Sequence, residues 1–395
     1  MTIADVKDAP VDDVDPQELM RDPYAAYERW RSLGPVVHVP RISRFLLTSP
    51  SAIRTAEQDA DTFTARQEVS TMVRALGGRP MLRKDDPEHA VEREAINPAL
   101  RPRRIGADWQ PRFERIVAER LDRLAEVPDD EVDLNRDFAA PVASRCLIEM
   151  LGFSDVTDEE MARWSTSLIA GIGNILDDDD IWRRAERTVT EVQERLDELL
   201  PRLRTAPDSS ITSHLLHAGL PEEAVRTNVM LTISGGMNEP QHMITGMVWA
   251  LDRHPAQRDR LIESQTGWAE AFEETVRWIS PIGMLPREST VETHVEGFRI
   301  PAGSNVGLLL ASANRHVDLI DRPDEYDTSR GSRGHLGFGS GSHLCAGRWA
   351  AKSIVGDVAL PRLYQRFPKL RVDDSRSTVW DGWVFRGITS LPVAR

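Results

Sequence analysis

Apolar residues recur every three or four positions along most of this chain, a period that predicts helices. Helices are expected over residues 18–34, 88–101, 109–126, 136–152, 157–175, 182–203, 221–253 and about 345–367. Short alternating stretches predict strands: a hairpin over 35–49, strands after about residue 282, and a terminal hairpin over 377–395. We therefore expect a mainly α fold with small β-sheets at one side (the α+β class), organised as a single domain over residues 1–395.

Composition limits the class of protein to which the chain can belong. Hydrophobic residues make up 40% of the 395 positions, enough for a large core. No apolar run reaches the roughly 18–20 residues that a membrane span requires, and the net charge of −14 argues against nucleic acid as a partner. The first dozen residues are acidic and lack the cationic and apolar regions of a signal peptide, so a cytoplasmic protein is expected.

One predicted helix contains residues that disfavour helices. The stretch SGGMNEPQ, residues 234–241, places Gly235, Gly236 and Pro240 inside the longest helical pattern, with Glu239 among them. Glycine costs about 1 kcal/mol and proline about 3 kcal/mol relative to alanine in a helix interior. Because Pro240 has no N–H, the carbonyl of Gly236 loses its helical partner. The sequence therefore predicts a helix that is opened at this point, as often happens at functional sites.

The chain has two cysteines, and their surroundings differ. Cys146 lies in the apolar helical stretch SRCLIEMLGF, where an ordinary core residue is expected. Cys345 ends a glycine-rich loop, in HLGFGSGSHLCAGRWAAK, and starts a predicted helix. Gly339 and Gly341 let this loop turn tightly and pass close to a flat object, and Gly347 leaves space beside the helix. Backbone N–H groups and the helix N-terminus are expected to lower the pKa of the Cys345 thiol, as suits a soft anionic ligand of a haem iron.

This loop resembles the haem-binding signature of the cytochrome P450 monooxygenases. The matching residues are Phe338-Gly339-x-Gly341-x-His343-x-Cys345-x-Gly347. The resemblance implies the cytochrome P450 fold, a single haem-thiolate domain, with haem b (iron protoporphyrin IX) as its cofactor and Cys345 as the ligand of the iron. It also implies that Phe338, Gly339 and Gly347 lie against the haem. The similarity extends from the opening DPYAAYERWRSLGPV to the C-terminal hairpin.

Other residues resemble the structural landmarks of this family. Glu274-x-x-Arg277 resembles the family's buried ion pair between a helix and a loop, and Arg322 resembles the arginine that joins the pair. The spacing alone has little weight because any helix face offers a Glu-x-x-Arg. Its position ahead of the cysteine loop gives it weight, and the implied role is structural.

The two haem propionates need cations or hydrogen-bond donors when they are buried. The family supplies a His-x-x-x-Arg pair, and this chain has His89 and Arg93 in HAVER, a spacing that places both on one helix face. Arg287, in PREST, and His335, in GHLGFG, match the remaining positions. The resemblance therefore implies that these four side chains gather around the propionates.

The opened helix resembles the one that crosses the oxygen-binding side of the haem. Family members usually carry an acid followed by a threonine there, and this chain has Asn238 followed by Glu239. In most relatives the threonine hydroxyl and a water relay protons to bound dioxygen, the co-substrate. Glu239 is expected to deliver those protons itself, with its pKa raised by desolvation, and to be able to act on peroxide. The alternative is a carboxylate that only lines a water-filled pocket. Asn238 is expected to orient water, and the carbonyl of Gly236 to bind dioxygen or water.

The Gly-x-x-Glu-Pro pattern resembles a bacterial subgroup that O-demethylates guaiacol and related methoxyaromatics. Leu76 and Ile172 stand where that subgroup has aromatic side chains, so the pocket is expected to be roomier and less aromatic. The apolar residues expected to line the substrate pocket are Ile233, Met237, Ile282, Met284, Leu285 and Phe385.

The leading hypothesis is a monooxygenase that hydroxylates or O-dealkylates a small apolar or aromatic substrate, with a methoxyaromatic as one candidate. A natural-product tailoring hydroxylase, a peroxide-using peroxygenase and a non-enzymatic haem sensor are the alternatives. The chain has no flavin or iron–sulfur motif, so electrons from NAD(P)H must come through a separate ferredoxin with its reductase, or through a flavin/iron–sulfur reductase. Arg348, Lys352 and the basic stretch 101–104 are expected on the Cys345 side, where an acidic partner would dock.

Overall fold

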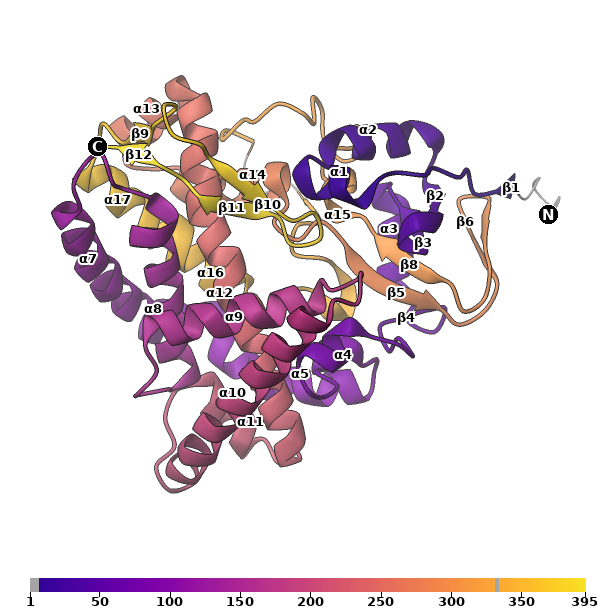
Figure 1. The fold of residues 1–395 in the computed structure, drawn as a ribbon, viewed down its shortest axis with the longest axis horizontal. Coiled ribbons are helices and arrows are strands. Elements are labelled where there is room, and N and C mark those ends of the chain that lie inside the picture. The colour runs from indigo at the N-terminus through magenta and orange to yellow at the C-terminus, as the bar shows by residue number, and fades with distance from the viewer. Residues whose placement is uncertain (1–6, 331–333) are drawn as a thin grey trace.

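The structure, a computed structural model, describes residues 7–330 and 334–395. Helices form most of it, and the strands gather in small sheets (Figure 1). In that view the helical part lies at the left and bottom, while the largest sheet and the first two helices lie at the right. The expected mainly α fold with small sheets at one side is therefore confirmed.

The helices have the following bounds. The α-helices are α1 (Pro16–Arg21), α2 (Tyr24–Leu33), α3 (Pro50–Gln58), α4 (Thr71–Ala75), α5 (Glu88–Leu100), α6 (Pro102–Arg104), α7 (Gln110–Glu126), α8 (Ala140–Leu151), α9 (Asp158–Ile172), α10 (Asp179–Thr205), α11 (Ile211–His217), α12 (Glu222–Arg253), α13 (Pro255–Ser264), α14 (Trp268–Ile279), α15 (Leu310–Ala313), α16 (Arg348–Lys352) and α17 (Leu360–Arg366). The 3-10 turns are η1 (Pro40–Ile42), η2 (Met81–Arg83) and η5 (Gly341–His343), and the π-helical turns are η3 (Ile105–Trp109), η4 (Asn135–Ala139) and η6 (Ser353–Ala359).

The first predicted helix, 18–34, is two helices in the structure. Asp22 and Pro23 separate α1 from α2, and Asp22 is extended (φ −150°, ψ 99°), the conformation favoured before proline. The Asp22 side chain then accepts the N–H of Tyr24 (3.1 Å) at the start of α2. The proline therefore ends the first helix although the apolar period continues past it.

The longest helix, α12, runs without interruption through the glycines and the proline of residues 234–241 (Figure 1). The prediction that the helix is opened at these residues is therefore wrong, because α12 is continuous there. Helices α8 and α9 pack against α12, and Ser165 of α9 donates to the carbonyl oxygen of Ser234 (3.3 Å). Tertiary packing of this kind supplies most of a helix's stability, so it outweighs poor helix formers in the sequence.

The strands form one five-stranded sheet and three smaller ones. Their bounds are β1 (Lys7–Asp8), β2 (Val36–Val39), β3 (Arg44–Leu47), β4 (Phe63–Thr64), β5 (Leu285–Ser289), β6 (Thr293–Val295), β7 (Phe298–Ile300), β8 (Asn305–Leu308), β9 (Arg371–Val372), β10 (Val379–Asp381), β11 (Gly387–Ser390) and β12 (Val393–Ala394). The largest sheet has the order β2-β3-β8-β5-β4, and the others are β1-β7-β6, β10-β11 and β12-β9. Antiparallel pairing of β2 with β3 and of β10 with β11 confirms both predicted hairpins.

The largest buried apolar cluster draws on residues from Met72 to Val393. Helix α12 crosses this cluster, and β11 packs against it. Among the described residues, no helix combines the length and the apolar character that a membrane span needs. The site is therefore built where the central helix, the C-terminal hairpin and the cysteine loop meet the edge of the largest sheet.

Candidate active site

The loop that precedes Cys345 is held by helix α3. Gly339 and Gly341 both have positive φ angles, 70° and 64°. A side chain at Gly341 would lie 2.7 Å from the backbone carbonyl oxygen of Glu57, and one at Gly339 would lie 3.1 Å from Glu57 Oε1. Between them, Ser340 donates its N–H to Glu57 Oε1 (3.0 Å) and its hydroxyl to Oε2. The absence of side chains at these two glycines therefore lets α3 pack closely against the loop.

Cys345 follows this loop, and the helix α16 begins three residues later, after Gly347. The N–H of Cys345 donates to the carbonyl oxygen of Phe338 (2.9 Å). The cysteine is part-exposed, yet protein surrounds it closely enough that burial raises the pKa of its thiol, against the opposing effect of the Gly347 N–H. The expected lowering of this pKa is therefore wrong for the protein alone, because burial outweighs the donors. A thiol that coordinates a metal ion is nevertheless deprotonated by the ion.

Cationic side chains gather beside the cysteine loop. They come from η2, α5, β5 and η5 and are Arg83, His89, Arg93, Arg287 and His343. The rings of His89 and His343 have centroids 4.2 Å apart, and Arg93 donates to the carbonyl oxygen of Leu344, next to the cysteine. Burial and the charges of the other four groups lower the pKa of His343 to about 2. We call these five residues the cationic cluster after its three arginines, since His343 with so low a pKa is neutral.

Among the described residues, the arginines of the cationic cluster have no carboxylate in an ion pair, although Glu57 and Asp85 are close enough to Arg287 to act on its pKa. Arg83 and Arg287 are 4% and 3% exposed, and their recorded hydrogen bonds go to the neighbouring carbonyl oxygens of Leu82 and Pro286 (both 2.9 Å). Within the described residues, no carboxylate forms an ion pair with Arg83, Arg93 or Arg287. Because a buried charge is costly without a partner, the cluster requires an anionic group.

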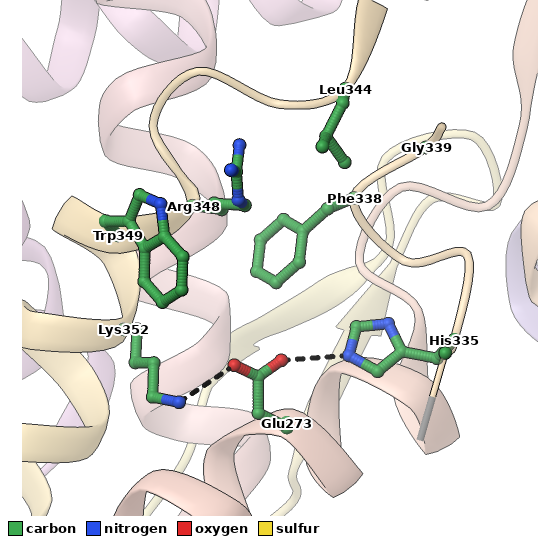
Figure 2. A pocket seen from close by; sticks show the side chains of 9 residues that line it. Glu273, His335, Phe338, Gly339, Leu344, Arg348, Trp349 and Lys352 are labelled. Carbon is green, nitrogen blue, oxygen red and sulfur yellow. Dashed lines mark hydrogen bonds and ion pairs between the residues drawn. The ribbon is translucent and has the colours of Figure 1, made fainter. Parts of the chain in front are cut away.

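His335, which we expected beside the propionates, lies elsewhere. Its Nε2 is 2.9 Å from Glu273 Oε2, and its Nδ1 accepts the N–H of Gly337 (3.1 Å), so both ring nitrogens are engaged. Figure 2 shows Glu273 between His335 and Lys352, whose Nζ lies 3.2 Å from Glu273 Oε1. His343 occupies the place beside His89 that was predicted for His335. The signal for His343 was present in the sequence, because it lies inside the signature motif itself.

The surface beside the cysteine loop contains a cavity of about 230 Å³. Its lining residues are Glu273, Gly334, His335, Phe338, Gly339, Leu344, Arg348, Trp349 and Lys352 (Figure 2). Arg348 donates to the carbonyl oxygen of Cys345 (3.0 Å), and α16 contacts η3, which directly follows the exposed residues 101–104. The structure therefore brings together two of the predicted docking elements, while Glu273 neutralises the third, Lys352.

One face of α12 is accessible although the helix crosses the core. Gly235 is exposed, and a side chain there would meet only Glu239 Oε2, at 3.8 Å. Gly236 instead faces Leu147 of α8, where a side chain would lie 2.8 Å from Cδ1. Gly235 therefore provides the free space on this face, whereas the missing side chain of Gly236 permits the packing of α8. Space at the site was predicted from both glycines, and the structure attributes it to the first.

Glu239 lies next to that free space. Its Oε2 atom is buried without a hydrogen-bond partner among the described residues. Burial raises the pKa of Glu239 to about 8, against a smaller opposing effect of its own N–H and of Asn238. Glu239 is also among the charges that raise the pKa of the Cys345 thiol, so the carboxyl and the sulfur lie close enough to interact. At neutral pH the carboxyl holds a proton that it can donate.

Three predicted lining residues lie together at the edge of this site. Ile282 and Phe385 form an isolated β-bridge and are both part-exposed. Leu285 is part-exposed too, and its Cδ1 atom would lie 3.6 Å from a side chain at Gly339. The bridge thus holds the segment after β10 beside the residues that precede β5, next to the cysteine loop.

The other three predicted lining residues belong to the core. Ile233 and Met237 of α12 are 0% and 2% exposed and pack within the largest apolar cluster. Met284 is 5% exposed, and its sulfur would lie 2.6 Å from a side chain at Gly307, so it packs on the sheet. In the structure these three side chains are therefore buried against protein and have almost no exposed surface.

The predicted structural ion pair is present and buried. Glu274 and Arg277 of α14 form two hydrogen bonds (2.7 and 2.8 Å), and Arg277 also donates to the carbonyl oxygen of Pro323 (2.7 Å). Arg322 does not join the pair, because it is exposed and binds Glu325 instead. Arg330 is the arginine whose Nε lies 3.5 Å from Glu274 Oε1.

These features together fit a haem. Cys345 is part-exposed, Gly235 leaves a helix face without a side chain, and Glu239 beside it is close enough to Cys345 to act on its thiol, which suits a flat group whose metal is bound from the Cys345 side. The cationic cluster requires an anion at one edge, and two propionates supply two carboxylates. A lone thiolate on a glycine-rich loop is one of the ligand sets by which proteins hold haem iron. The residues of the chain therefore match the group that the sequence implied.

Comparisons with known proteins agree with this site. A family model described as "Cytochrome P450" matches residues 269–377. The chain is 30% identical over 390 residues to the vitamin D(3) 25-hydroxylase of Pseudonocardia autotrophica, covering 94% of each protein. It is also 30% identical over 317 residues to the 6-deoxyerythronolide B hydroxylase of Saccharopolyspora erythraea, covering 78% of this chain and 76% of that one.

Among solved structures, one that resembles the chain is the crystal structure of P450BioI in complex with hexadec-9Z-enoic acid ligated acyl carrier protein. The TM-score is 0.88 at 26% identity, and the match covers 96% of this chain and 100% of that one. Similarity of sequence over nearly the whole length, similarity of fold and the cysteine loop lead to one conclusion. The chain belongs to the cytochrome P450 family of haem-dependent monooxygenases.

Proposed function

We propose that this cytochrome P450 monooxygenase hydroxylates or O-dealkylates a small apolar or aromatic substrate, and that Glu239 delivers the protons for the reaction. The observation that carries the proposal is the position of Glu239, whose Oε2 is buried without a hydrogen-bond partner among the described residues, beside the open position of Gly235 and close enough to Cys345 to act on its thiol. The family uses haem b, dioxygen and electrons from a redox partner. One oxygen atom enters a C–H bond, and the other leaves as water after taking up two electrons and two protons.

When it is bound, the haem supplies the iron that binds dioxygen and activates it. The sulfur of Cys345 would hold this iron from one side, and the cationic cluster would neutralise the propionates. Arg93 connects the two parts of the site, because it belongs to the cationic cluster and donates to the Leu344 carbonyl oxygen beside the cysteine. The cluster therefore positions the group relative to α12.

Glu239 is placed to hold and release a proton at Oε2. This atom has no hydrogen-bond partner among the described residues, and the position of Gly235, which has no side chain, lies beside it. A general acid is most effective when its pKa lies near the working pH, as a pKa of about 8 does. The amide of Asn238 can orient water but carries no ionisable proton. Glu239 is therefore the group to which proton delivery is assigned.

An apolar substrate suits the three side chains that lie together at the edge of the site. Ile282, Leu285 and Phe385 have no polar atoms, so they bind by excluding water from apolar surface. At a methoxy group, hydroxylation of the carbon yields a hemiacetal that breaks down to an alcohol and formaldehyde. The Gly-x-x-Glu-Pro pattern supports a methoxyaromatic. The names of two relatives, which refer to vitamin D(3) and 6-deoxyerythronolide B, favour a natural-product hydroxylase as the second candidate.

A spectral titration of the purified haem protein tests the substrate class. Methoxyarenes, terpenoids and macrolides are added in parallel, because a ligand that displaces water from the iron shifts the haem band to shorter wavelength. For a methoxyarene that binds, turnover with NAD(P)H and a ferredoxin system should release one formaldehyde per substrate consumed. Binding of macrolides alone, with no formaldehyde from any methoxyarene, would support the second candidate instead.

Phe385→Ala is expected to weaken the binding of the best ligand about tenfold. Burial of an aromatic side chain is worth about 1.5–3 kcal/mol, and 1.4 kcal/mol corresponds to a tenfold change in Kd. Val384→Ala is the matched control, because Val384 packs against the core cluster of the N-terminal helices and not at the edge of the site. Equal losses in both variants, measured by the same titration, would show that Phe385 acts through the hairpin and not through the ligand.

Replacing both His89 and Arg93 with alanine is expected to weaken haem retention by about 10–100-fold while the chain still folds. Unpaired buried propionates would cost on the order of 1–3 kcal/mol. The measurement is the transfer of haem to apomyoglobin, with circular dichroism as the check on folding. Arg115→Ala removes a surface arginine that is paired with Glu119 and Glu149, and should leave transfer unchanged. Normal retention in the double variant would contradict the assignment.

A further inference from the structure

Arg83 is buried with unused hydrogen-bonding capacity. It ends the short turn η2 and is 4% exposed. One of its terminal nitrogens donates to the carbonyl oxygen of Leu82 (2.9 Å), while Nε is buried with no partner among the described residues. A guanidinium has five N–H donors and keeps its positive charge in proteins. Most of the donor capacity of Arg83 is therefore not used by the chain itself.

The charges around Arg83 have the same sign as its own. Arg287, Arg44 and Arg79 are the charged groups that act on it, and with burial they lower its pKa to about 9. The nearby Glu92 is already committed to other partners, since it pairs with Lys84 and accepts from the Asn228 amide (2.7 Å). Within the described part of the chain, the recorded hydrogen bond of the Arg83 side chain goes to a carbonyl oxygen and not to a carboxylate.

The turn that carries Arg83 is fixed to its neighbours. The N–H of Met81 donates to Asn228 Oδ1 of α12 (2.9 Å), and Arg79 donates to the carbonyl oxygen of Arg83 (3.2 Å). Lys84 on the other side is tied to Glu92 of α5. The turn is therefore fixed to two helices, and a buried cation without a partner is a permanent cost to the protein without its cofactor.

We propose that Arg83 is a third arginine that binds the haem propionates, together with Arg93 and Arg287. The turn η2, which Arg83 ends, packs against α5, the helix that carries His89 and Arg93, and Arg287 is close enough to act on Arg83, so Arg83 lies at the same edge of the site. Two carboxylates then meet three guanidinium groups, so each propionate has more donors than it needs and one positive charge is left in surplus. That surplus favours the more electron-rich state of the iron, because a nearby cation stabilises added negative charge.

This inference rests on the proposed haem site, and its test separates the two. Arg83→Met removes the charge and keeps much of the volume, and Arg83→Lys keeps the charge. Arg120→Met is the matched control: Arg120 is equally buried (4% exposed) but is paired with Asp158. For each full-length variant, urea unfolding of the haem-extracted protein and haem transfer to apomyoglobin are measured.

Arg83→Met should leave the haem-free protein at least as stable as the wild type while haem leaves about tenfold faster. Arg83→Lys should recover part of that retention, and Arg83→Met should shift the reduction equilibrium of the bound haem towards the oxidised form. Arg120→Met should destabilise the haem-free protein. Unchanged haem transfer in Arg83→Met, or a loss of haem-free stability like that of Arg120→Met, would overturn the proposal. Failure of the haem site as a whole would appear instead as normal retention in the variant that lacks His89 and Arg93.

Discussion

Cys345→His is expected to retain part of the haem but to lose both monooxygenase activity and the red-shifted carbon monoxide band of the reduced protein. A cysteine thiolate pushes electron density onto the iron and favours cleavage of the O–O bond, which a neutral imidazole does much less. The product rate should therefore fall to background. The measurements are the spectrum of the carbon monoxide complex and the product formed per minute with a ferredoxin system.

The other cysteine provides a matched control for this variant. Cys146 is fully buried in the apolar cluster that surrounds α8, and Cys146→Ala should keep the band and the activity. A Cys345→His protein that retained the red-shifted band would show that another residue ligates the iron. Loss of the band in Cys146→Ala with haem still bound would have the same meaning.

Glu239→Gln is expected to lower ferredoxin-driven turnover by tens of fold with little change in ligand binding. General acid–base groups contribute about 10²–10⁴-fold, and water can replace part of this contribution at an accessible site. The glutamine keeps the size of the side chain and loses its ionisable proton. Product formation is measured with the ferredoxin system and, separately, with hydrogen peroxide alone. Equal rates for wild type and variant in both assays would leave Glu239 without a catalytic role.

The pH dependence gives an independent reading of the same group. Burial raises the pKa of Glu239 to about 8, so the carboxyl is protonated and able to donate below that pH and loses its proton above it. Turnover of the wild type should therefore decline as pH rises past about 8, and Glu239→Gln should lack this decline. Glu239→Thr should keep ferredoxin-driven activity and lose peroxide-driven activity, because a hydroxyl relays protons but is a weak acid–base group for peroxide. Asn238→Ala should have a smaller effect than either.

Features that depend on local sequence were predicted well. The cysteine loop, the two hairpins and the Glu274–Arg277 pair each follow from residues that are close in the chain, and the structure contains all of them. The split of the first helix also follows from a local rule, that for proline. The prediction missed it because the apolar period, which continues across Asp22 and Pro23, was given more weight.

Features that depend on where a side chain points in the folded protein were predicted less well. The cysteine loop and the residues before it contain two histidines, and only the folded chain shows that His335 contacts Glu273 while the ring of His343 lies beside that of His89. Arg322 and Arg330 differ in the same way, since the second one reaches Glu274 from a buried position. Arg83 gave no signal at all, because an arginine followed by Lys84, Asp85 and Asp86 looks like a surface residue until its burial is known.

The direction of each side chain also decides whether a residue lines the site or belongs to the core. Apolar side chains at the right positions of α12 were assigned to the pocket, but Ile233 and Met237 point into the cluster formed with α8 and α9, and Gly235 and Glu239 occupy the accessible face. Hydrophobic periodicity shows that a helix has a buried face. It does not distinguish a face buried by protein from a face that borders an internal space.

The contact between Glu57 and the cysteine loop has a consequence for how this protein can be divided. The segment recognised by the family model begins at residue 269 and contains the entire signature, but the carboxylate that holds Ser340 lies on α3, near the other end of the chain. A fragment that starts at α14 would carry every residue of the motif and lack the support that shapes its loop. Such long-range contacts also form late when a chain folds. The cofactor site therefore cannot be transferred with the C-terminal segment alone, because its loop is shaped only when α3 packs against it.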